Sequence, residues 1–294
     1  MQLNHNQENS IRPITRNTYK VLKLHTKESS DNLNEFYTSS DYHSRLSAIK
    51  NLAMLSGGLV PSYIMLDAMK DPCSMIREFA VENFDYKKVT AEIEMELARL
   101  AKEDEKVQMR MLALEKLSEI DTQAHYDLFF NSSLLKNAKE AAAGLKALAK
   151  LDIEKAYKVA KFRAETSKSD LDIAITEVFA QVGDIKDLPY CKRYCGERQN
   201  FYKTRYIPSY LRMLIKVGNA RVFKHHLDFM ADDVKFSEKE TLLPIFITQL
   251  QALARDLNKG DFDLAMLKRE LLPFVNDLID QLLENKERVP EILK

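Results

Sequence analysis

One short pattern recurs four times along the first half of this chain, at intervals of about 32 residues. Each copy has a small residue, an aliphatic residue directly after it, and a leucine or phenylalanine three positions further on. The small residues are Ala48, Ala80, Ala113 and Gly144. A fixed period of this length is typical of proteins built from stacked repeats, so the spacing restricts the fold more than any single residue does.

Each copy has the spacing of one buried face of a helix, because positions i, i+1 and i+4 lie side by side on a helix. A second helical segment follows each copy, and the small residue marks a place where two helices cross closely. The expected second helices are 62–69, 89–101, 123–133 and 153–164. A weaker fifth copy is expected at 175–182. The pattern predicts an all-α protein, an α-α superhelix (solenoid) of helical repeats.

The organisation along the chain is uneven. Residues 1–36 are rich in Asn, Ser, Thr and Lys, and we expect a linker or the remnant of an upstream domain, with one strand-like run at 19–24. Residues 37–184 hold the clear repeats, and 185–294 hold degenerate helical repeats. Two amphipathic helices at about 239–257 and 261–283 are expected to cap the apolar end of the array.

Composition excludes several classes of protein. The chain has only seven glycines and eight prolines, which suits long helices with short turns. Its 44 basic and 44 acidic residues balance, so nothing favours a nucleic-acid partner. No apolar run is long enough to span a membrane, and the first residues carry no signal peptide. We therefore expect a cytoplasmic location if the chain is complete.

The sequence lacks the motifs of the common catalytic and cofactor sites. It has no H-E-x-x-H, no P-loop, no G-x-G-x-x-G and no G-x-S-x-G. Cys191 and Cys195 share a helical face and could bind a metal or form a redox pair, but two free thiols are favoured. His225 and His226 are adjacent and point about 100° apart, which favours a helix-surface pair over shared ligands. We predict no catalytic residue, metal or cofactor in this chain.

A stretch at 201–210 interleaves aromatic residues with basic ones. Such a mixture suits a peptide or single-stranded nucleic acid, but the zero net charge favours ordinary helix packing. If the chain has a surface that faces a peptide or partner, its candidates are Tyr202, Arg205, Tyr206 and Tyr210.

Charged residues recur with the repeats. Arg45, Arg77 and Arg110 precede the small residues of the first three copies, and Asp71 and Asp104 lie six residues before the last two of these arginines. We expect Asp and Arg of adjacent units to form a ladder that holds the register. Exposed ion pairs of this sort contribute about 0–1 kcal/mol each.

The aspartate, the arginine six later, the small residue and the aliphatic residue resemble the HEAT repeat, best in the copy at 71–81. The segments 35–52, 69–77, 142–156 and 177–184, in this order, resemble the C-terminal helical region of bacterial M1-family zinc aminopeptidases. The resemblance covers about residues 20–284. It implies HEAT-like repeats that form part of a peptide chamber wall, with zinc and peptidase chemistry in a catalytic domain whose motifs do not occur here.

Two hypotheses follow. The chain is the non-catalytic C-terminal domain of an M1-type aminopeptidase, with the catalytic domain as its partner. Alternatively, it is a free-standing HEAT-repeat scaffold whose concave face binds a protein or a peptide. The first predicts an extensive apolar patch near the N-terminal repeats, and the second predicts polar caps at both ends.

Overall fold

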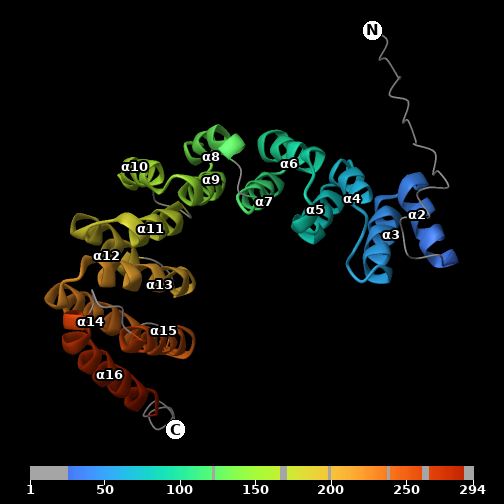
Figure 1. Cartoon of the computed structure of the whole chain (residues 1–294). Coiled ribbons are helices and arrows are strands. Elements are labelled where there is room, and N and C mark those ends of the chain that lie inside the picture. Colours follow the sequence, from blue (N-terminus) through green and yellow to red (C-terminus); the bar gives the residue numbers. More distant parts are fainter. Residues whose placement is uncertain are drawn as a thin grey trace. The chain divides into compact units, whose positions relative to one another are not determined.

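A computed structural model describes residues 26–120, 123–165, 171–197, 200–236, 239–259 and 265–287. Within these ranges the protein is all-α, with fifteen α-helices and no strand (Figure 1). The predicted fold class is therefore confirmed at the level of an all-α protein. The chain forms two compact units, residues 1–128 and 129–294, and the division falls within α8 (Tyr126–Ser133).

Unit 1 consists of helices that pair in sequence order and stack in two layers. One layer contains α3, α5 and α7, each packed against the next, and α4 packs against α6 in the other. The pairs α2–α3, α4–α5 and α6–α7 are also in contact. The helices are α2 (Lys27–Thr38), α3 (Tyr42–Leu55), α4 (Ser62–Met69), α5 (Ser74–Asn83), α6 (Ala91–Glu103) and α7 (Val107–Leu117), with short 3-10 turns at Tyr86–Lys88 and Gln123–His125.

Unit 2 repeats this two-layer arrangement with longer helices. One layer runs through α9, α11, α13 and α15, and the other runs through α12, α14 and α16, while α10 packs on both α9 and α11. The helices are α9 (Ala138–Leu151), α10 (Ile153–Ala164), α11 (Leu171–Val182), α12 (Leu188–Glu197), α13 (Asn200–Val217), α14 (Ala220–Phe236), α15 (Lys239–Lys259) and α16 (Ala265–Glu287), with a 3-10 turn at Ile185–Asp187.

The recurring residues form the core of both units, as their helical spacing predicts. The small residues and the aliphatic residues after them are almost completely buried. They are Ala48, Ile49, Ala80, Val81, Ala113, Leu114, Gly144 and Leu145. At Gly144 the expected close crossing is present, because an added Cβ would lie 2.5 Å from the backbone nitrogen of Ser133 in α8. A side chain at this position would push the two helices apart.

Polar residues fix several helix starts. Asp152 ends α9 and begins α10, where its carboxylate accepts the Lys155 amide at 2.9 Å. Asp41 and Thr90 cap α3 and α6 in the same way. The two helices predicted at 62–69 and 153–164 have the predicted bounds. Asp152 marks the start of the second, whereas the first begins after Pro61 without a side-chain cap.

One expectation differs from the structure. The segment 1–36 is not all linker: α2 begins at Lys27, and Leu33 and Phe36 are buried in it, since its apolar face packs on α3. The compact units divide at 128, so residue 184 lies inside unit 2, and the bounds 37–184 and 185–294 stay a prediction. The strand-like run at 19–24 lies outside the described residues.

Candidate functional site

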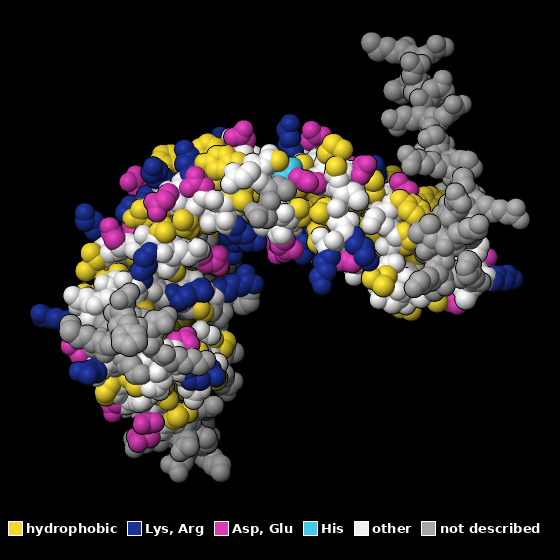
Figure 2. Space-filling model, in the orientation of Figure 1, with side chains coloured by type: hydrophobic (Ala, Val, Ile, Leu, Met, Phe, Trp, Pro, Cys, Tyr) yellow, Lys and Arg dark blue, Asp and Glu magenta, His cyan; other side chains and the backbone are white. Residues whose placement is uncertain are grey.

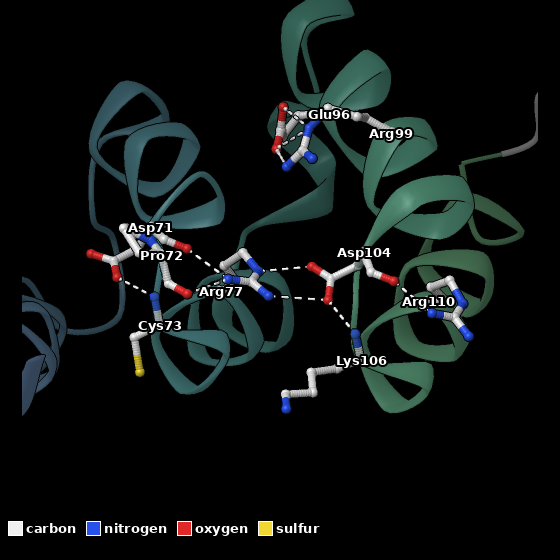
Figure 3. A network of polar contacts seen from close by, with 9 residues as sticks. All are labelled: Asp71, Pro72, Cys73, Arg77, Glu96, Arg99, Asp104, Lys106 and Arg110. Atoms are coloured by element: carbon white, nitrogen blue, oxygen red, sulfur yellow. Dashed lines mark hydrogen bonds and ion pairs between the residues drawn. The ribbon is translucent and has the colours of Figure 1, made fainter. Parts of the chain in front are cut away.

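The repeat charges of unit 1 form a continuous ladder. Arg77 donates Nε to Asp104 Oδ2 at 2.8 Å and Nη2 to Asp104 Oδ1 at 3.0 Å, so one guanidinium holds both carboxylate oxygens (Figure 3). Arg45 holds Asp71 with the same two-bond geometry, at 2.8 and 3.0 Å. Each arginine therefore connects its own repeat to the next one. Paired hydrogen bonds of this kind fix the orientation of the two side chains in addition to pairing their opposite charges.

The ladder also holds the turns between helices. Arg77 Nη1 donates to the carbonyl oxygens of Asp71 and Pro72, both at 2.8 Å, and Arg110 Nη1 donates to the carbonyl of Asp104 (Figure 3). The aspartate carboxylates in turn accept amide hydrogens two residues later. The carbonyls and carboxylates named here thus have partners within the repeat framework.

The ladder is buried, which corrects the expectation of exposed pairs. Asp71, Arg77 and Asp104 are 8%, 6% and 6% exposed. The two aspartates lie in the turns before α5 and α7, and Arg77 lies in α5 between them. Removing one member would leave a buried charge without its partner, which costs about 3–5 kcal/mol. The ladder is a structural device, and its carboxylates are fully engaged by the guanidinium groups.

Two of the four residues predicted to face a peptide or a partner, in the stretch at 201–210, are buried. Tyr206 and Tyr210 are 1% and 0% exposed, because α13 turns these side chains into the core between its neighbours. The alternative interpretation of this stretch, helix packing, fits both tyrosines. Arg205 is exposed on α13, and the side chain of Tyr202 lies outside the described residues.

Histidine 226 is tied to this core. Its Nδ1 lies at a short hydrogen-bonding distance from the hydroxyl of Tyr210. Burial lowers the pKa of His226 to about 4, and the nearby cation of Lys192 and the ring of His225 act in the same direction. His226 is therefore neutral at physiological pH. It is half-buried in the contact between α13 and α14, and does not lie on the open helix surface that the sequence favoured.

The cysteines show no metal geometry in the described part of the chain. Cys191 is completely buried, with its Sγ 3.4 Å from Met213 Sδ. The side chain of Cys195 lies outside the described residues. Among the described side chains, no group of three His, Cys, Asp or Glu residues is placed to hold a metal ion.

An open depression of about 470 Å³ lies where α10, α11 and α12 meet in unit 2. Its charged centre is the buried Asp187, which accepts bonds from Lys161 Nζ at 2.5 Å, the Tyr157 hydroxyl at 2.8 Å and the Asp184 amide at 3.0 Å. Lys186 and Arg193 line the rim. Because the carboxylate already has three donors, this cluster acts as a brace between α10 and the turn before α12.

A surface rich in basic side chains lies on α9, α11 and α13. A depression of about 220 Å³ between α9 and α11 is lined by Lys146, Lys150, Glu177 and Gln181. Figure 2 shows Lys and Arg side chains gathered over this part of unit 2. This surface is not evident from the net charge of the whole chain, which is zero. Its signal was local: α13 contains four basic residues and no acidic one.

No family model, curated protein or solved structure matches this chain. Of the described helices, none has the length and apolar character needed to cross a membrane.

Proposed function

We propose that this chain is a non-catalytic helical-repeat module, with repeats of the HEAT type, that binds a protein or a peptide. The supporting observation is the ladder of Arg45, Asp71, Arg77 and Asp104 in unit 1. It ties the first repeat to the second and the second to the third through two-bond ion pairs, and the Arg77–Asp104 pair is buried. A register fixed in this way gives the exposed helix faces a constant spacing, which is what a repeat protein uses to bind an extended partner.

A narrower form of the proposal makes the chain the C-terminal helical domain of an M1-type aminopeptidase. It would form part of the peptide chamber wall, and zinc and the peptidase reaction would belong to a catalytic domain outside these residues. The resemblance of the segments at 35–52, 69–77, 142–156 and 177–184 supports it. The alternative is a free-standing scaffold with a protein or peptide partner.

The size of the native polypeptide separates these two forms. An antibody raised against this chain is used on an extract of the source cells. A band far above 34.0 kDa supports the aminopeptidase domain, and a band at 34.0 kDa contradicts it and supports the free-standing scaffold.

Binding itself is tested with a random peptide library displayed on phage and selected against the folded full chain. Enriched peptides are synthesised, labelled and titrated by fluorescence anisotropy. We expect saturable binding in the micromolar range, about −8 kcal/mol. Heat-denatured chain is the control, because a module that works through a folded surface must lose binding on unfolding. If no peptide is enriched over this control, the binding function is wrong.

A further inference from the structure

Two rows of basic side chains with the same spacing lie on α9 and α13. Each row has steps of seven and four residues, which keeps its members on one side of a helix. All six side chains are exposed. The rows are Lys139, Lys146 and Lys150 on α9, and Arg205, Arg212 and Lys216 on α13. We call these six residues, with Glu177 and Gln181 of α11, the basic face.

The two rows lie on opposite sides of α11, which packs against both α9 and α13. Contacts from each row reach α11. Lys146 Nζ lies 2.9 Å from Glu177 Oε2, and Lys216 Nζ donates to the carbonyl oxygen of Gln181. Lys216 thus also satisfies a carbonyl group in the last turn of α11.

Acidic residues are nearly excluded from the basic face. The described residues of α9, α11 and α13 include three acidic side chains, of which Glu140 and Asp172 are buried. Only Glu177 reaches the face, and it is paired with Lys146. The whole chain has a net charge of zero, so this excess of positive charge is local to the face. A local potential of one sign attracts ligands of the opposite sign.

The dimensions of the face fit an extended peptide. Eleven residues of helix span about 16 Å, which is the length of each row. Neighbouring helices pack about 8–10 Å apart, so each row lies about that far from the axis of α11. An extended chain rises about 3.3 Å per residue and directs alternate side chains to opposite sides. About five residues lying along α11 would therefore direct successive side chains to the α9 row and the α13 row in turn.

We propose that the basic face binds an acidic segment of a partner polypeptide, extended along α11. This inference rests on the proposed binding function and specifies its surface and partner. Nucleic acid fits less well, because binding of single strands relies on exposed aromatic rings for stacking, and the described tyrosines of α13, Tyr206 and Tyr210, are buried.

The test uses the full chain and a fluorescein-labelled peptide of alternating Glu and Ala, with a Gln–Ala peptide as its neutral partner. We expect the Glu peptide to bind and its Kd to rise with added salt, because exposed charges are screened. Lys139→Glu and Arg212→Glu should each raise Kd about threefold to tenfold. Arg269 is exposed on α16, which packs on α14 and α15, so Arg269→Glu should change the Kd less than about twofold.

Glu177→Gln provides a test of opposite sign. Removing this carboxylate should lower the Kd of the Glu peptide about twofold to fivefold, because the negative charge of Glu177 repels the negative peptide. Circular dichroism checks that each variant is folded. Equal binding of the Gln–Ala peptide, or equal effects of Arg269→Glu and Arg212→Glu, would overturn the proposal, and so would stronger binding of a single-stranded oligonucleotide of equal charge. If library-selected peptides still bind in those cases, the binding function stands and only the assignment of the face is wrong.

Discussion

The buried ion pair between Arg77 and Asp104 gives the sharpest test of how unit 1 holds together. Arg77→Met keeps much of the side-chain volume but removes the guanidinium. The carboxylate of Asp104 then stays buried without the two guanidinium hydrogen bonds that it accepts. The carbonyl oxygens of Asp71 and Pro72 each lose the hydrogen bond from Arg77. Breaking a buried pair from one side costs about 3–5 kcal/mol of unfolding free energy.

Lys88→Met is the matched control, because Lys88 and Asp85 form an ion pair 3.1 Å apart in the same unit with the lysine 59% exposed. An exposed pair of this kind should cost less than about 1 kcal/mol. The double variant Arg77→Met with Asp104→Asn removes both charges and keeps an oxygen that can accept the Lys106 amide. We expect the double variant to be less damaging than the sum of the two single changes by about 2 kcal/mol or more.

The losses are measured by denaturant unfolding, followed by far-UV circular dichroism, and by hydrogen exchange of the amides in α5 and α7. Exchange reports the stability of these helices separately from the rest of the chain. The reasoning is refuted if Arg77→Met costs no more than Lys88→Met, or if the two single changes are additive in the double variant. Either result would mean that the site is solvated and that the two-bond geometry contributes little.

Three further changes test other contacts. Gly144→Ala should cost about 1–3 kcal/mol, because its Cβ would meet the Ser133 nitrogen at 2.5 Å, while the half-buried Ala143→Ser should stay within about 0.5 kcal/mol in the same thermal unfolding assay. Asp187→Ala should lower the free energy of unfolding by about 2–3 kcal/mol in denaturant unfolding, since three donors lose their acceptor. Its control, Asp184→Ala, leaves the carboxylate of Asp187 in place and should cost less. The pKa of His226, about 4 when folded, lies below its unfolded value of about 6.5, so the unfolded chain binds more protons between these values. Stability should therefore fall as the pH drops from about 6.5 to about 4, and a His226→Gln variant that keeps the same slope would show that burial of the neutral ring is not its cause.

Local sequence signals determined the helices of this protein. The spacing of Ala48, Ala80, Ala113 and Gly144 identified the buried stripes, and caps such as Asp152 fixed the ends, because each of these depends on neighbours within a few residues. The pairing of Arg77 with an aspartate of the next repeat was also predictable, since a constant period gives successive repeats the same geometry.

The tertiary structure decided what is buried. Tyr206, Tyr210 and the Asp–Arg ladder resemble surface features in the sequence, yet they lie inside, because burial depends on which elements cover a helix face and not on the residue types along it. The same reason applies to the basic face. Its six cations come from segments about 60 residues apart, and only the packing of α9 and α13 on either side of α11 brings them together.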